Sequence, residues 1–293
     1  MIWFVLGTCS AVLSAASAII QKKILFRLTA LEFSFLVSAV ILIVSLCVPF
    51  SVDVASIPST TLMILIGKSV LGGSAFLLVM MSLEHNQISS ALPLLGLTPG
   101  VTAVLALIVI GESLQPSEWA GIGLMMAGTY TLEMRPGQKF LQPFKSIFTN
   151  RNFYFIYGAV GLFAVSSVAD KALVSSYRVD PLVVLFYQHI VYCMLFGLQL
   201  LLRRYSFSTL VKKGKGQLPF ILAAALLTIG YRFTQLEAAK LAPIALVLAV
   251  KRTSILYATF FGGRMFSDDR LSVKLFAGAL IVVGGFIILR NVG

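Results

Sequence analysis

The stretch from Ala242 to Gly263 reads Ala-Pro-Ile-Ala-Leu-Val-Leu-Ala-Val-Lys-Arg-Thr-Ser-Ile-Leu-Tyr-Ala-Thr-Phe-Phe-Gly-Gly. As a helix it is long and apolar enough to cross a bilayer, but Lys251 and Arg252 fall about 12 Å of helical rise from Pro243, near its middle. A charged side chain at that depth costs about 2.5–3.5 kcal/mol on insertion scales. The stretch therefore predicts a membrane helix whose two cations face protein, water or an anion.

The two cations are neighbours in the chain, so their side chains point about 100° apart on a helix. One carboxylate on an adjacent helix would therefore not satisfy both Lys251 and Arg252. An anionic ligand or a water-filled space suits the pair better. A structural role, with a carboxylate or freed backbone carbonyls as partners, stays open as the alternative.

The composition excludes a soluble domain. The chain has 293 residues, of which 58% are hydrophobic and 12% charged, and its apolar runs are about twenty residues long. The net charge is +12, yet the basic residues lie mostly between these runs, and no basic tail or aromatic-interleaved basic patch is present. The partners we expect are therefore a lipid bilayer and a small-molecule substrate, not nucleic acid.

Ten intervals have the composition of membrane helices, which predicts an all-α integral membrane protein with ten transmembrane helices. These are, in approximate bounds, 2–20, 31–50, 61–83, 87–110, 117–134, 153–174, 181–202, 217–239, 243–263 and 271–290. The longest polar interval divides the chain into a first five-helix repeat at 1–134, a linker at 135–152 and a second five-helix repeat at 153–293. Five crossings are an odd number, so a tandem duplication inserts its second copy upside down and gives two inverted repeats.

Acidic and basic residues recur at corresponding places in the two halves. The first span ends with Gln21-Lys22-Lys23 and the sixth with Ala169-Asp170-Lys171, and Glu112 after the fourth span corresponds to Asp268 after the ninth. This correspondence favours a duplication with a site between the repeats, near the middle of the membrane.

Together these features resemble the drug/metabolite transporter superfamily, in particular its ten-helix EamA-like branch. The residues that carry the resemblance are the stretch from Pro99 to Gly111-Glu112, Trp119-Ala120-Gly121, Lys171, and Val250-Lys251-Arg252-Thr253-Ser254. The resemblance implies a transporter of small metabolites that works by alternating access, without nucleotide hydrolysis and without a cofactor. The chain departs from the family pattern at Asp268-Asp269, where a single Glu is usual, and at Ile255, where many members have Pro.

The Lys251-Arg252 pair is also similar to a Lys-Arg pair that plastid triose-phosphate translocators use to hold phosphate. A planar guanidinium beside a compact ammonium suits phosphate or carboxylate, so we expect a small anionic substrate. The alternatives are an exporter of amino acids or drug-like compounds, or a membrane subunit that transports nothing. An enzyme is not expected, because the chain has no zinc motif, no metal-ligand spacing and only two histidines, His85 and His189.

Polar side chains inside the predicted spans are the candidate substrate ligands. They are Lys251, Arg252, Ser254, Tyr231, Arg232, Gln188, His189 and Tyr192. Gln188 and Tyr192 share a helix face at i and i+4. In the seventh span such residues are also typical of interhelical hydrogen bonds, and both interpretations stay open there.

A second group of residues is predicted to take part in the conformational change of transport. Candidate gating or coupling residues are Glu84, Asp170, Lys171 and Glu237, and candidate hinge residues are Pro93, Gly96 and Pro99. Prolines free backbone carbonyls and glycine permits bending, which favours a hinge in the fourth span. Glu237 is also three residues from Lys240, which favours a simple ion pair at a helix end. Lys68, early in the third span, is expected to extend to the membrane interface.

Loop charges and family resemblance predict opposite orientations. Basic residues are concentrated after spans 1, 3, 5, 7 and 9, which by the positive-inside rule places those loops in the cytoplasm and both termini outside. Relatives are described with cytoplasmic termini, so the orientation stays open. We expect a multi-pass protein of a bacterial inner (plasma) membrane, as a monomer or homodimer.

Overall fold

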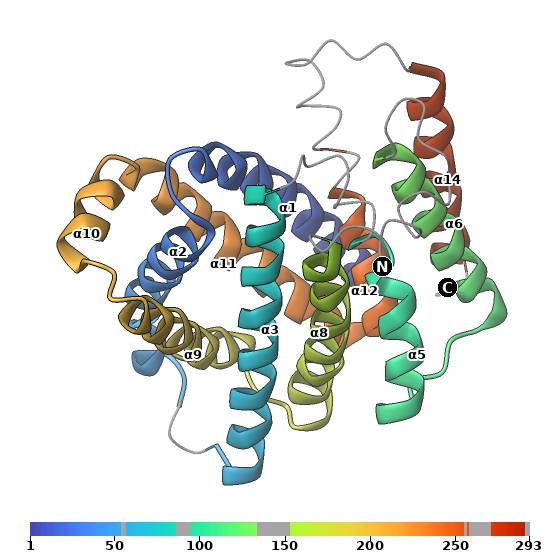
Figure 1. The fold of residues 1–293 in the computed structure, drawn as a ribbon. Coiled ribbons are helices and arrows are strands. Elements are labelled where there is room, and N and C mark those ends of the chain that lie inside the picture. The colour runs from blue at the N-terminus through green and yellow to red at the C-terminus, as the bar shows by residue number, and fades with distance from the viewer. Residues whose placement is uncertain (54–56, 86–94, 134–152, 255–256, 258–270, 291–293) are drawn as a thin grey trace.

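The chain is described by a computed structural model that covers residues 1–53, 57–85, 95–133, 153–254, 257 and 271–290. In these residues it is all-helical, with eleven α-helices, one 3-10 turn and one π-helical turn (Figure 1). The α-helices are α1 (Ile2–Leu25), α2 (Ala30–Ser45), α3 (Ser59–His85), α5 (Thr98–Ile110), α6 (Pro116–Glu133), α8 (Phe153–Lys171), α9 (Pro181–Leu202), α10 (Phe207–Lys215), α11 (Leu218–Leu241), α12 (Ile244–Arg252) and α14 (Leu271–Arg290). The 3-10 turn is η1 (Val48–Phe50), and the π-helical turn η2 (Ala172–Ser176) directly continues α8.

Each of the ten predicted intervals contains a helix, and six of these helices are long and apolar enough to cross a membrane. The six candidate spans are Ile2–Leu25, Ala30–Phe50, Ser59–Ser82, Tyr154–Ser176, Pro181–Leu202 and Leu218–Leu241. The chain is therefore an all-helical, multi-pass membrane protein. The expected continuous helices at 87–110 and 243–263 are described only in part, as α5 and α12, and the short helix α10 was not predicted.

Local sequence explains several helix ends. Thr29 and Glu32 form a reciprocal capping box at the start of α2, and the Asp180 side chain accepts a hydrogen bond from the Leu182 amide at the start of α9. α5 ends at Gly111, whose φ of 68° lies in the left-handed region that glycine adopts without a Cβ penalty. This turn places Glu112 at one end of the helix bundle.

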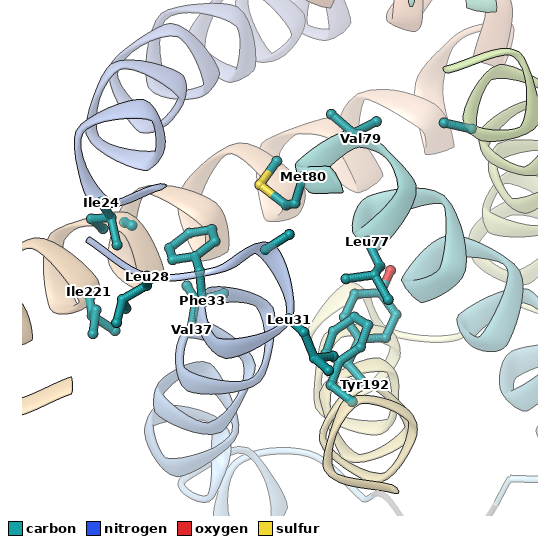
Figure 2. Close-up of a cluster of buried hydrophobic side chains, with 14 of the residues drawn as sticks. Ile24, Leu28, Leu31, Phe33, Val37, Leu77, Val79, Met80, Tyr192 and Ile221 are labelled. Carbon is teal, nitrogen blue, oxygen red and sulfur yellow. The ribbon is translucent and has the colours of Figure 1, made fainter. Parts of the chain in front are cut away.

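Packing brings helices of the first and second halves together. α6 packs along α14, α1 along α11, and α3 along α8. Figure 2 shows one buried apolar cluster that joins both halves, with Phe33 of α2, Leu77 of α3, Tyr192 of α9 and Ile221 of α11. Both halves of the chain therefore contribute to this cluster.

The α6–α14 pair depends on small residues at its contact. A Cβ on Gly284 would lie 2.6 Å from the carbonyl oxygen of Gly121, and one on Gly121 would lie 2.9 Å from the carbonyl oxygen of Gly284. Backbones can come this close only where neither helix carries a side chain, which is how small residues support helix packing in membranes.

Alanine at Gly284 is expected to lower the free energy of unfolding by about 1–3 kcal/mol, because the added methyl group would force the two backbones apart. The neighbouring Gly285 is the matched control, since a Cβ there would meet nothing within 4 Å. Gly285→Ala is expected to leave stability unchanged or raise it slightly, because alanine favours helix. Thermal unfolding in detergent measures both variants, and equal stability of the two would contradict a close α6–α14 contact.

Candidate functional site

A buried cluster of charged side chains lies where α3, α8, α9 and α11 meet. At its centre is Asp170, which is 1% exposed. Lys68 Nζ lies 2.8 Å from Asp170 Oδ1, and an Arg232 amino group donates a hydrogen bond of 2.8 Å to Asp170 Oδ2. One carboxylate thus contacts cations from two different helices.

Gln188 of α9 completes this cluster. Its side-chain oxygen accepts hydrogen bonds from Lys68 at 2.6 Å and from Arg232 at 3.0 Å. The four side chains therefore form a closed ring of contacts contributed by four helices. We call Lys68, Asp170, Gln188 and Arg232 the charge cluster.

The expectation that Lys68 extends to the membrane interface is wrong. Lys68 is 2% exposed, and it lies about 13 Å of helical rise beyond the first residue of α3, which is too deep for its side chain to leave the core. The Asp170 carboxylate is the counter-charge of Lys68 there, and the Gln188 oxygen accepts a hydrogen bond from it. The depth argument that identified Lys251 would have identified Lys68 as well.

Tyr192 and His189 line the same part of α9. A Cβ on Gly72 would lie 2.7 Å from the Tyr192 hydroxyl, and one on Gly73 would lie 3.0 Å from the Tyr192 ring, so two glycines of α3 make room for this side chain. His189 is buried, and its Nδ1 lies 2.8 Å from the Leu185 carbonyl oxygen within its own helix. In the described hydrogen bonds neither residue contacts a charged group directly.

The side chain of Lys251 contacts α11. Its Nζ donates a hydrogen bond of 2.6 Å to the Gln235 side-chain oxygen and lies 4.5 Å from the centre of the Tyr231 ring. Tyr231 and Gln235 share a face of α11 at i and i+4, and Arg232 is the next residue in the chain. Lys251 is partly buried and contacts the face of α11 that carries Tyr231 and Gln235. Because Arg232 follows Tyr231 in the chain, Lys251 lies beside the charge cluster.

Arg252 points to a different helix. Its guanidinium donates a hydrogen bond of 3.0 Å to Thr98 Oγ1 at the start of α5. The divergence expected for two adjacent cations is therefore observed, and each reaches a separate polar partner. Ser254 is partly buried and lies one residue beyond Thr253, the C-cap of α12.

The candidate hinge residues lie at a helix start. Pro99 is in the first turn of α5, where backbone amides have no partner within the helix, so a proline there loses no hydrogen bond. Gly96 is buried in the turn just before the helix. Pro93 lies outside the described residues. In the described part α5 begins at Thr98, so Gly96 and Pro99 lie where a helix starts, and a hinge role for them stays a prediction.

Lys171 and Glu112 bind backbone groups at the junction between α11 and α12. Lys171 Nζ donates hydrogen bonds to the carbonyl oxygens of Ala239 at 2.7 Å and Ala242 at 2.9 Å, at the end of α11. Glu112 Oε2 accepts a hydrogen bond of 2.9 Å from the Ile244 amide, at the start of α12. The two side chains also form an ion pair at 3.4 Å, so each helix end meets the charge that suits its dipole.

The other candidate gating residues lie apart from the charge cluster. Glu84 accepts a hydrogen bond of 3.0 Å from the Ala30 amide at the start of α2. Glu237 forms an ion pair of 2.9 Å with Lys240 on its own helix, which confirms the helix-end pair predicted for them. Asp170, by contrast, is the centre of the charge cluster. Sequence reasoning did not find Gln235 and Thr98, because single uncharged polar residues give no distinctive signal.

Positive charge exceeds negative charge around Lys251. The charge cluster contains two cations and one carboxylate, and no described carboxylate lies within ion-pair distance of Lys251. An excess of cations in surroundings of low dielectric can attract an anion strongly. In the described part of the chain, no three or more His, Cys, Asp or Glu side chains gather as metal ligands.

Comparisons with known proteins agree with this fold. The model of the EamA-like transporter family matches residues 1–134, and no curated protein matches the chain. Among solved structures 29 chains match. One of them, a crystal structure described simply as that of a protein, superposes with a TM-score of 0.74 at 17% sequence identity, and the alignment covers 97% of this chain and 95% of that chain. At this identity the likeness shows the fold alone. Residues 1–134 thus match the EamA-like transporter family, which is part of the drug/metabolite transporter superfamily.

Proposed function

We propose that this protein is a secondary active transporter of a small anionic metabolite that carries a phosphate or carboxylate group, in a bacterial inner membrane. The observation that carries the proposal is Lys251, a partly buried cation beside Arg232 with no described carboxylate within ion-pair distance. A cation that has no carboxylate partner among the described residues is costly inside a membrane protein. A substrate anion would remove that cost when it binds.

Helix packing supports two repeats related by a two-fold axis. The five helices of the first half, in chain order, correspond to the five helices of the second half. The pairs of corresponding helices are α1 and α8, α2 and α9, α3 and α11, α5 and α12, and α6 and α14. The α1–α11 contact then becomes α8–α3, the α1–α12 contact becomes α8–α5, and the α2–α11 contact becomes α9–α3. All of these contacts occur, as do the self-related pairs α2–α9, α5–α12 and α6–α14. With five crossings in each half, this symmetry favours an inverted repeat and alternating access.

The proposed substrate site lies where the halves meet. Lys251, Tyr231 and Arg232 belong to the second half, and Arg252 reaches Thr98 of the first half. A ligand held by these residues would contact both repeats at once. Movement of one repeat against the other would then open the site to one side of the membrane or the other.

A thermal-shift screen of the purified protein tests the proposal. Phosphorylated metabolites and carboxylates are compared with neutral analogues of the same carbon skeleton. A ligand that binds only the folded state stabilises it by about 2.7 kcal/mol at a hundred times its Kd, so a true substrate raises the unfolding temperature and should enter liposomes that contain the protein. If only neutral or cationic compounds do so, the anionic-substrate proposal fails.

We further propose that Lys171 and Glu112 form a latch that holds the α11–α12 junction in the observed conformation. Replacing either residue with Ala should lower the free energy of unfolding by about 1–3 kcal/mol, because backbone groups at a helix end lose a charged partner. Thermal unfolding in detergent measures this change, and substrate uptake into liposomes measures its effect on transport.

A charge swap separates a helix-end latch from a simple ion pair. The double variant Glu112→Lys with Lys171→Glu keeps the two opposite charges but places a cation at the N-terminus of α12 and an anion at the C-terminus of α11, where each is repelled. We expect it to be at least as unstable as the single variants. Restoration of parental stability would show that mutual attraction alone matters and would contradict the latch.

A further inference from the structure

The short helix α10 lies outside the ten-helix pattern and connects α9 to α11. Phe207, Leu210, Val211 and Gly214 recur at i, i+3, i+4 and i+7, so they share one face. Leu210 and Gly214 are buried, and Gly214 lies against Leu36 of α2. Phe207 and Val211 are 67% and 36% exposed. One part of this apolar face is therefore packed on the bundle, and the other part is uncovered.

Ion pairing fixes α10 to the bundle. Lys213 Nζ donates a hydrogen bond of 2.7 Å to Glu32 of α2, and the Tyr205 hydroxyl donates to the same carboxylate. The hydrogen bond to Glu32, followed by that to Tyr205, raises the pKa of Lys213, so this side chain stays charged and bound to α2. The other basic side chains near α10 are exposed to the surroundings.

The segment around α10 carries positive charge only. Between residues 203 and 215 all charged residues are cations, namely Arg203, Arg204, Lys212, Lys213 and Lys215. More positive charge lies at the same end of the molecule, since Lys23 at the end of α1 lies 4.3 Å from the centre of the Phe220 ring at the start of α11. Exposed Arg27 follows it in the chain.

The neighbouring helices set the depth of α10. α9 ends at Leu202 and α11 begins at Leu218, and both are candidate membrane spans. α10 therefore lies at the level where the chain leaves and re-enters the hydrocarbon, on the side of the bundle opposite α6 and α14 (Figure 1). A helix with an uncovered apolar edge beside clustered lysines at this level is typical of the membrane interface.

We infer that α10 and the preceding Arg203-Arg204 turn form a binding surface for anionic phospholipids, with the phosphate headgroups on Arg203, Arg204, Lys212 and Lys215 and the acyl chains on Phe207 and Val211. The occupant is a lipid and not free phosphate, because exposed Phe207 and Val211 need a hydrocarbon partner that a free ion does not offer. Basic residues near a membrane surface each attract anionic lipid. The inference is independent of the transported substrate.

Native mass spectrometry of the purified full-length protein tests this surface. Delipidated protein in a neutral detergent is titrated with phosphatidylglycerol and, separately, with phosphatidylcholine. We expect the double variant Lys212→Gln with Lys215→Gln to bind phosphatidylglycerol about tenfold more weakly, with phosphatidylcholine binding unchanged. The matched control, Arg178→Gln with Lys240→Gln, removes two cations outside this surface and should bind phosphatidylglycerol like the parent. Equal losses in the two double variants, or no loss in the first, would overturn the inference.

A second pair of measurements separates lipid from free anion. Phe207→Gln keeps every charge but removes the apolar contact, so it should also weaken phosphatidylglycerol binding, by about threefold or more. Inorganic phosphate added at millimolar concentration should not displace the lipid. If Phe207→Gln binds like the parent and inorganic phosphate displaces phosphatidylglycerol, the surface recognises only phosphate and the lipid inference is wrong. Unchanged thermal unfolding of each variant in detergent shows that the substitutions leave the fold intact.

Discussion

Replacing Asp170 with Asn is expected to lower the free energy of unfolding by about 3–5 kcal/mol, because it leaves the buried Lys68 and the partly buried Arg232 without a counter-charge. Asp170 is the carboxylate that both cations contact, at 2.8 Å in each case. Asparagine is nearly the same size, so the loss measures charge compensation and not packing. Thermal or denaturant unfolding in detergent gives the change.

Asp180→Asn is the matched control for this substitution. Asp180 caps α9 through the Leu182 amide at 2.8 Å, and asparagine caps helices about as well as aspartate, so stability should hardly change. Adding Lys68→Met to Asp170→Asn should recover part of the loss, since one uncompensated cation is removed. A loss below about 1 kcal/mol for Asp170→Asn alone would contradict a compensating role for this carboxylate.

Replacing Lys251 with Ala is expected to weaken binding of the anionic substrate by about a hundredfold or more, because removing one partner of a desolvated charge contact costs about 2–5 kcal/mol. Arg252→Ala should have a similar effect, and Arg252→Lys a smaller one, since lysine keeps the charge but loses the planar fork. Calorimetry with a ligand from the thermal-shift screen measures affinity, and liposome uptake measures transport.

Lys23→Ala is the control for the binding prediction, because Lys23 is an exposed lysine over the Phe220 ring at one end of the bundle. It should bind substrate like the parent. If Lys251→Ala and Arg252→Ala are folded and also bind and transport like the parent, the two cations are structural and the anionic-substrate proposal falls with them. Failure of the latch between Lys171 and Glu112 would not affect this conclusion, since the latch is measured by stability.

Some of the site could be predicted because charge deep in an apolar run is conspicuous. Lys251, Arg252 and Arg232 were identified for that reason. The 100° divergence expected for adjacent side chains is also observed, since Lys251 contacts Gln235 and Arg252 contacts Thr98. Lys68 was misjudged because its distance from the start of its helix was underestimated. Asp170 and Lys171 were recognised as charged residues at the end of a span, but their partners are 50 or more residues away in the chain.

The amino-acid sequence by itself determined that this is a helical membrane protein, because apolar runs of membrane length leave the backbone no other way to satisfy its hydrogen bonds in lipid. It also predicted the ten intervals that contain helices, and it identified Lys251 and Arg252 as cations that cannot face lipid. Only the tertiary structure decided that Asp170 contacts both Lys68 and Arg232, that Lys171 and Glu112 bind at the α11–α12 junction, and that α10 docks on Glu32. These contacts join side chains from separate helices, and helix periodicity fixes only the face on which a side chain lies, not the helix that packs against that face.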